Sequence, residues 1–234
     1  DTTAICEGDT VLLTEEYADH YDSLLWTTTG DGSFSDATML NPEYIPGPND
    51  IVNGTVELTL TATGAGPCPV TASTMPVSIT GAPVASAGLD TTMCTSETSI
   101  TLAGSASHYS SILWTTSGNG TFSDPSILTP TYTPDPTDIN AGLVTLTLTS
   151  SGNGTCEPIS DSLLLTIIIA PMAYAGDTTA ICEGDTVLLT EAYADHYDSL
   201  LWTTTGDGSF SDATILNPEY IPGPNDIVNG TVEL

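Results

Sequence analysis

Short runs in which apolar and polar residues alternate recur along the chain, and glycine, proline or asparagine bounds each of them. The clearest run, residues 56–62, alternates with a period of two, as expected for a strand with one buried face. Residues 11–14, 23–27 and 75–80 are similarly short and rich in threonine and β-branched residues. No segment shows a 3.6-residue apolar period of helical length. The pattern predicts an all-β chain, with turns at residues 30–32, 46–50, 53–54 and 64–67.

This pattern repeats. Residues 177–234 match residues 1–58 at an offset of 176, and only Glu16/Ala192 and Met39/Ile215 differ. A more diverged copy lies at half that offset, 88 residues. The period divides the chain into repeats at 1–88, 89–176 and 177–234, of which the last is a truncated copy of the first. We expect a slice of a long array in which two repeat types alternate.

Each repeat of 88 residues carries roughly seven short strands, which fits one immunoglobulin-like β-sandwich. The segments 83–88 and 171–176 begin with proline and are short and apolar. Such segments are typical of semi-rigid linkers, so we expect a rod of tandem sandwiches.

A resemblance to a known family rests on three motifs of the first repeat. They are Leu-Trp-Thr-Thr-Thr-Gly-Asp-Gly-Ser-Phe at 25–34, Asn-Pro-Glu-Tyr-Ile-Pro at 41–46 and Val-Glu-Leu-Thr-Leu-Thr-Ala-Thr at 56–63. The chain resembles the PKD-like, immunoglobulin-like repeat of very large bacterial cell-surface proteins. Thr27 and Thr28 depart from the usual Asp-Phe of that pattern. The resemblance implies the fold, whereas adhesion, spacing and assembly all remain open as functions.

The cysteines occupy two positions of the repeat, Cys6, Cys94 and Cys182 at the first and Cys68 and Cys156 at the second. Pairing within each repeat predicts Cys6–Cys68 and Cys94–Cys156, with the partner of Cys182 outside the slice. Bridging between repeats is the alternative. Because no Cys-x-x-Cys motif or Cys/His cluster occurs, disulfides are favoured over metal binding, which indicates an oxidising, extracellular location.

The charge is one-sided, with 30 acidic residues, no lysine or arginine, and a net charge of −30. Binding to nucleic acid or to anionic membrane surfaces needs cationic side chains, so both are excluded as functions. No apolar run is long enough to insert into a membrane. Apolar residues make up 39% of the chain, enough to bury a core, so the charge does not indicate disorder.

Two kinds of candidate site lie on turns. Asp31, Asp36 and Asp50 place hard oxygen ligands on glycine-rich loops, which suggests Ca²⁺ as a cofactor. The alternative is that these aspartates are solvated turn residues without a ligand. No other cofactor is indicated. The Asp-Ser/Thr-apolar tripeptides resemble O-glycosylation acceptors of the same bacterial group, and turn formation is their alternative. These candidate acceptors are Thr10, Ser23, Ser162, Thr186 and Ser199.

Three aromatic or titratable residues recur once per repeat. The tryptophans Trp26, Trp114 and Trp202 are expected in the core, in preference to a sugar-stacking surface. For the tyrosines Tyr44, Tyr132 and Tyr220 we expect structural anchors whose hydroxyls bond backbone. The histidines His20, His108 and His196 have no nucleophile or second histidine nearby, so we expect surface or structural roles and no enzyme activity.

Two functions follow. The first is an extracellular structural protein that forms a bacterial fibre or filament with other copies of itself. The second is an adhesin whose loops bind a glycan or a partner protein, with or without Ca²⁺. The first and third repeats agree in their loops as well as in their strands, which favours the structural protein.

Overall fold

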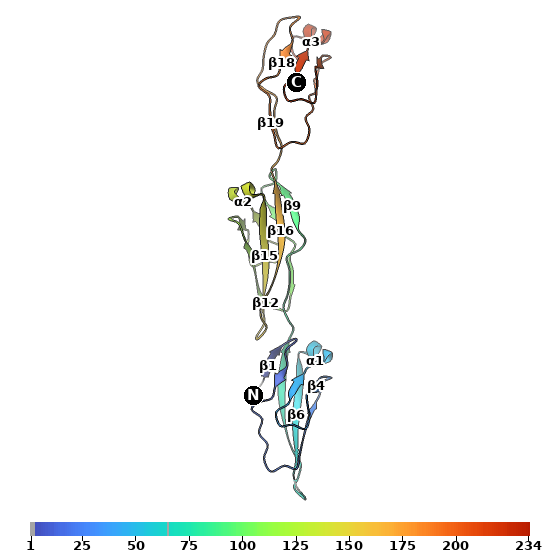
Figure 1. Ribbon diagram of the computed structural model, residues 1–234, viewed down its shortest axis with the longest axis vertical. Coiled ribbons are helices and arrows are strands. Elements are labelled where there is room, and N and C mark those ends of the chain that lie inside the picture. Colours follow the sequence, from blue (N-terminus) through green and yellow to red (C-terminus); the bar gives the residue numbers. More distant parts are fainter. Residues whose placement is uncertain (1–2, 65) are drawn as a thin grey trace. The chain divides into compact units, whose positions relative to one another are not determined.

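The computed structural model describes residues 3–64 and 66–234. The chain is all-β with short helices (Figure 1), and its contacts divide it into two units. The larger unit comprises residues 1–93 and 97–167, which hold most of the first two repeats, and the smaller one comprises residues 94–96 and 168–234. The immunoglobulin-like sandwich expected from the sequence is confirmed in the first two repeats.

The first repeat forms two sheets. Its elements are β1 (Thr3–Cys6), β2 (Val11–Leu12), β3 (Ser23–Thr28), β4 (Ser33–Phe34), β5 (Glu43–Ile45), α1 (Pro48–Asn53), β6 (Thr55–Thr63) and β7 (Thr71–Thr80). One sheet has the order β1-β7-β6-β3 and the other β2-β5-β4. All pairs are antiparallel except β1 with β7, which run parallel with Cys6 opposite Thr80.

The second repeat follows the same plan. Its elements are β8 (Val84–Ser86), β9 (Thr91–Cys94), β10 (Ile100–Thr101), β11 (Ser105–Ser107), β12 (Tyr109–Thr116), β13 (Thr121–Phe122), β14 (Thr131–Thr133), α2 (Pro136–Ala141), β15 (Leu143–Gly152) and β16 (Ile159–Ile168). The sheet orders are β12-β15-β16-β9 and β10-β14-β13. β8 lies in the segment expected as a linker and pairs with β11, because an extended segment beside a free strand edge can complete its hydrogen bonds. The repeat boundaries stay a prediction from the periodicity.

The segment at the end of the second repeat forms β17 (Met172–Tyr174). The third repeat forms β18 (Val187–Leu188), β19 (Tyr193–Asp195), β20 (Ser209–Phe210), β21 (Glu219–Ile221) and α3 (Pro224–Asn229). β18-β21-β20 make a three-stranded sheet and β17 pairs with β19. β18, β20 and β21 keep the register of β2, β4 and β5 in the first repeat at an offset of 176, as the near-identity of these two repeats requires.

Alternating apolar residues of facing strands build the two cores of the larger unit. In the second repeat Trp114, Leu146, Leu148 and Leu165 are at most 2% exposed. Trp26, Leu58 and Val77 take the corresponding places in the first repeat. The predicted core position of the tryptophan is therefore confirmed in both. Trp202 of the third repeat is half-buried and lines a hollow with Leu201, Leu216 and Leu234.

The expectation of an all-strand repeat was incomplete, because each repeat carries one six-residue helix at the end of its sandwich (Figure 1). A helix this short cannot show a 3.6-residue apolar period. Its signals are caps: proline at the first helical position and, for α2, Asp135 accepting a hydrogen bond from Thr137 N–H. Gly142 ends α2 in the left-handed conformation, with φ of 71°.

Candidate functional site

A buried carboxylate organises the loops at one end of each sandwich. In the first repeat Asp50, on α1, is 1% exposed and lies beside Tyr44 of β5. Its carboxylate accepts hydrogen bonds from Tyr44 Oη at 2.6 Å, from Gly47 N–H at 3.0 Å and from Gly32 N–H at 3.1 Å. A further N–H, that of Asp31, lies 3.2 Å from the other oxygen. We call this arrangement the Tyr–Asp cluster, and its members in the other repeats are Tyr132 with Asp138 and Tyr220 with Asp226.

The second repeat builds the same cluster with a different loop residue. Asp138 accepts from Tyr132 Oη at 2.8 Å and from the N–H groups of Asn119, Gly120 and Asp135 at 2.9, 2.8 and 3.1 Å. Asn119 replaces the aspartate that the first and third repeats carry at this position. The cluster depends on backbone donors, so that substitution leaves it intact.

Glycine at two loop positions makes the close approach possible. A Cβ atom on Gly118 would lie 2.1 Å from Asp138 Oδ1, and one on Gly120 would lie 2.4 Å from Tyr132 Oη. Real Cβ contacts do not come this close. The Gly-x-Gly turn that follows each tryptophan strand is therefore a requirement of the buried carboxylate.

The structure brings only part of the candidate calcium set together. Asp31 lies near Asp50, but its carboxylate accepts from Asn49 N–H and Nδ2 at 3.1 and 3.0 Å. Asp36 lies on another turn and accepts from Thr38 N–H and Oγ1 at 2.9 and 2.7 Å. Within residues 3–64 and 66–234, no group of three or more His, Cys, Asp or Glu side chains is placed to hold a metal ion. Calcium binding stays a prediction.

The tyrosine was correctly expected to be an anchor, since Tyr44 and Tyr132 are 0% exposed. Its main partners differ from the expectation, however, because the hydroxyl bonds two side chains, Asp50 and Thr28 in the first repeat. The sequence carried one signal for this arrangement: Tyr and Asp stand six residues apart in every repeat.

The cluster shifts the pKa values of both its members. Burial alone would raise the pKa of Asp138, but the bonds from Asn119 N–H, Tyr132 Oη, Asp135 N–H and Gly120 N–H outweigh it and hold the pKa below 3.8. Burial and the neighbouring Asp138 raise the pKa of Tyr132 to about 12, against the bond from Thr116. Asp50 and Tyr44 shift in the same directions.

These shifts predict a pH window for stability. A carboxyl with a depressed pKa stabilises the fold above its unfolded pKa, and that contribution is lost as the pH falls through the lower folded value. A tyrosine with a raised pKa contributes fully below pH 10, and this is lost as the pH rises towards 12. Calorimetry at high salt, which screens the repulsion of the −30 charge, should show the midpoint falling below pH 3.8 and above pH 10. A flat midpoint across both limits would contradict the cluster.

The second feature is a disulfide that joins two repeats. Cys6 bonds Cys156, and the two Cα atoms lie 4.9 Å apart. The predicted pairs Cys6–Cys68 and Cys94–Cys156 are therefore wrong, and the alternative of bridging between repeats is correct for Cys6. Cys68 and Cys182 are exposed free thiols.

Strand direction explains why pairing within a repeat fails. Cys6 lies opposite Thr80, at the last residue of β7, whereas Cys68 precedes Thr71, the first residue of that strand. Ten residues of strand span about 33 Å. A disulfide requires Cα atoms closer than about 7 Å, so Cys6 and Cys68 cannot meet.

Close contacts surround the bridge. Cys156 Sγ lies 3.6 Å from the carbonyl oxygen of Thr80 and 3.7 Å from that of Gly81. The ring of His108 lies against Gly81, where an added Cβ would meet it at 3.0 Å. Ala82 N–H donates to Glu7 Oε2 at 3.1 Å. We call these residues, with Cys6, the junction.

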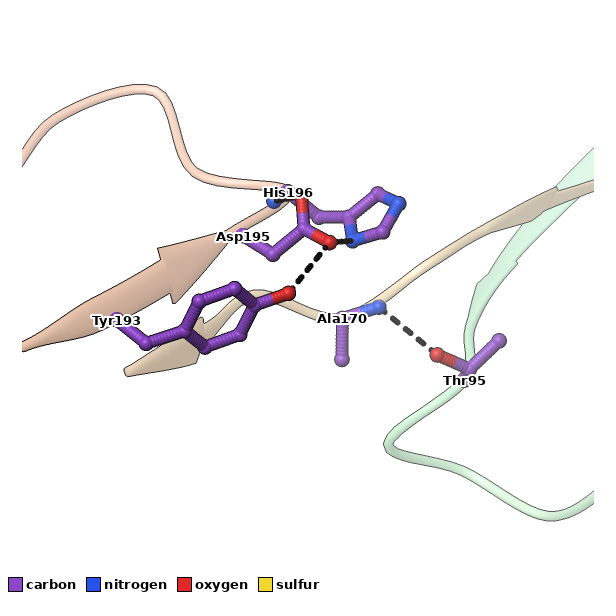
Figure 2. A network of polar contacts seen from close by, with 5 residues as sticks. All are labelled: Thr95, Ala170, Tyr193, Asp195 and His196. Atoms are coloured by element: carbon purple, nitrogen blue, oxygen red, sulfur yellow. Dashed lines mark hydrogen bonds and ion pairs between the residues drawn. The ribbon is translucent and has the colours of Figure 1, made fainter. Parts of the chain in front are cut away.

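The smaller unit shows part of the same contact pattern. Ala170 N–H donates to Thr95 Oγ1 at 2.8 Å (Figure 2), and Thr95 N–H donates to Ile168 O at 2.9 Å. These positions correspond to Ala82, Glu7 and Thr80 at an offset of 88. The backbone after the first cysteine position therefore docks in the same way at both places.

The histidines occupy turns. His20, His108 and His196 all have φ between 53° and 55°, a left-handed conformation that is uncommon outside glycine. In the smaller unit Asp195 accepts from Tyr193 Oη at 3.0 Å and lies 3.4 Å from His196 Nδ1 (Figure 2). All three are exposed, which confirms the expected surface role.

The candidate glycosylation residues differ in what their hydroxyls do. Thr10 and Thr186 donate to Glu43 and Glu219, and the Ser162 hydroxyl lies 2.8 Å from that of Thr147. Ser23 and Ser199 are exposed. Modification of these residues stays a prediction.

Comparison with known proteins yields structural likeness without a family. No family model matches the chain, and no curated protein matches it. Among solved structures, three immunoglobulin domains of titin align over 96% of this chain and 87% of theirs, at 11% identity and a TM-score of 0.48. Human CDH23 EC21-23 aligns over 95% and 88%, at 14% identity and 0.47. Likeness at this level establishes neither a family nor a function.

Protocadherin Gamma B7 extracellular cadherin domains 1-4 align over 94% of the chain at 12% identity, with a TM-score of 0.41. This chain spans 65% of that structure's length. None of the helices formed by the described residues has the length and hydrophobicity needed to span a bilayer.

Proposed function

We propose that this chain is an extracellular, non-enzymatic structural protein, a slice of a long repeat array that forms a bacterial surface fibre or filament. The observation that carries the proposal is the Cys6–Cys156 bridge, because it ties consecutive repeats covalently in addition to the backbone. Such a bond limits how far the two repeats can separate or bend, which suits a load-bearing polymer. It also supports an oxidising location.

The repeated Tyr–Asp cluster supports the same function. In the first repeat the loop residues Asp31 and Asp50 accept hydrogen bonds from the chain's own donors. A loop built in this way is fixed in shape. The resemblance to PKD-like repeats supports the bacterial surface as the setting. Other copies of the chain are the proposed partners, and contacts among them must dispense with basic-to-acidic bridges, since the chain has no lysine or arginine.

Electron microscopy of the native protein, with and without a calcium chelator, tests the proposal. Regular filaments with an axial spacing of one or two repeats are the expected result. If filaments disassemble only in the chelator, Ca²⁺ takes part in assembly. Isolated flexible tethers that bind a glycan array would instead support the adhesin and overturn the structural function.

A further inference from the structure

Cys68 and Cys182 are free thiols, although their counterparts in other repeats are bonded. Cys68 corresponds to Cys156 at an offset of 88, and Cys182 corresponds to Cys6 at an offset of 176. Both thiols are exposed. The bonded pair, by contrast, is at most 9% exposed.

The backbone around each thiol has the same local conformation as the backbone around its disulfide-bonded counterpart. Cys182 N–H donates to Asp185 Oδ2 at 3.3 Å, as Cys6 N–H donates to Asp9 Oδ2 at 3.2 Å. The following glycines, Gly8 and Gly184, have φ of 94° and 93°. The turn that presents Cys6 to its partner is thus also present at Cys182, whose thiol forms no disulfide.

The loop of Cys68 matches that of Cys156 in the same way. Gly66 and Gly154 have φ of 65° and 62°. An added Cβ on Gly64 would meet the Cys68 Cβ at 2.9 Å, and one on Gly152 would meet the Cys156 Cβ at 2.6 Å. Both loops therefore fold back on their cysteine.

Cys68 cannot form a disulfide with Cys6 of its own repeat. β7 separates Cys68 from Cys6 by about 33 Å, as argued above. Thr95 bonds Ile168 and Ala170 as Glu7 bonds Thr80 and Ala82, so the residue after the first cysteine of the second repeat is docked in the same way as the residue after Cys6.

We propose that the bridge between Cys6 and Cys156 is one member of a series, in which the first cysteine of every repeat bonds the second cysteine of the next repeat in the same polypeptide. Cys182 bonds the second cysteine of the repeat that follows it, and Cys68 bonds the first cysteine of the repeat that precedes it. The inference rests on the proposed array. Each bond forms when two thiols lose two protons and two electrons to the disulfide of a thiol–disulfide oxidoreductase, which is reduced to its dithiol through a mixed disulfide.

The test uses the whole chain, residues 1–234, extended by a second copy of residues 59–176 and secreted into an oxidising compartment. This completes the third repeat and adds a fourth, which gives 5 + 3 = 8 cysteines. The proposed series forms three bridges and leaves two thiols, one towards each end. Pairing within repeats forms four bridges and leaves none. Alkylation before reduction, read by intact mass, counts the thiols.

Peptide mapping identifies the partners, because the four cysteine contexts differ: Ile-Cys-Glu, Met-Cys-Thr, Pro-Cys-Pro and Thr-Cys-Glu. Pepsin at low pH suits the digestion, since trypsin has no site and acid suppresses thiol exchange. The series predicts that Ile-Cys-Glu peptides bond only Thr-Cys-Glu, and that Pro-Cys-Pro bonds only Met-Cys-Thr. Bonds between Ile-Cys-Glu and Pro-Cys-Pro would overturn it.

Two serine variants of the extended chain serve as matched controls. Cys182→Ser should expose a third thiol, in a Thr-Cys-Glu peptide, and the absence of label from every Thr-Cys-Glu peptide would contradict the series. Cys68→Ser should lower the thiol count from two to one, whereas pairing within repeats would raise it from none to one. The bond map is independent of filament formation, so its failure is distinguishable from failure of the proposed function.

Discussion

Replacing Asp138 by alanine should destabilise the second repeat by about 3 kcal/mol or more, because several buried donors lose their acceptor at once. Tyr132 Oη and the N–H groups of Asn119, Gly120 and Asp135 all bond this carboxylate. Leaving one such group unpaired costs about 1–3 kcal/mol. Urea unfolding followed by circular dichroism measures the change.

An exposed aspartate of the same repeat provides the control. Asp124 accepts from Ser126 N–H and Oγ on the surface, so Asp124→Ala should change the free energy of unfolding by about 0.5 kcal/mol. If Asp138→Ala fails to fold, Tyr132→Phe removes one bond and should cost about 1 kcal/mol. Equal unfolding midpoints for Asp138→Ala and Asp124→Ala would refute a stabilising role for the cluster.

Breaking the Cys6–Cys156 bridge should have the second large effect. The bond closes a loop with a sequence separation of 150, for which the chain-entropy relation gives about 5 kcal/mol. Because most residues of both cores lie within that loop, the full effect appears only when the two repeats unfold together. Cys156→Ser should therefore lower the calorimetric midpoint of the larger unit and separate the transitions of its two repeats.

Cys182→Ser is the matched control for this change, since Cys182 is exposed and lies outside the bridge. Its unfolding curve should coincide with that of the unmodified chain. Adding dithiothreitol should make the unmodified chain behave like Cys156→Ser. An unchanged midpoint on reduction would show that the bridge does not couple the two repeats.

The elements that follow from local pattern were predictable from the sequence, and those that depend on strand direction were not. The run at residues 56–62 became β6, and Trp26 and Trp114 lie in the cores, because alternation and size report burial directly. The pairing of Cys6 depended on β1 running parallel to β7, and no feature of those four residues reveals their partner strand. Cys68 is nearer to Cys6 than Cys156 is along the chain, but it lies farther from Cys6 in the fold.

The Tyr–Asp cluster shows the same limit on a smaller scale. Gly-rich turns and an aspartate at position 50 are visible in the sequence, and they suggested a cation. What fills the role of a cation is a set of N–H and O–H dipoles that α1 and the preceding turn aim at the carboxylate. Those donors belong to the backbone, so residue types alone do not disclose them.

The Cys6–Cys156 bond also changes what a broken backbone means for this protein. A cut at any of the 150 peptide bonds between the two cysteines leaves both fragments attached through sulfur. The disulfide is thus a second covalent connection between the two ends of this stretch, so a single cut in the backbone does not separate the chain. In the proposed surface polymer, a protease can cut this stretch once and the chain still bears tension, until a reductant breaks the disulfide.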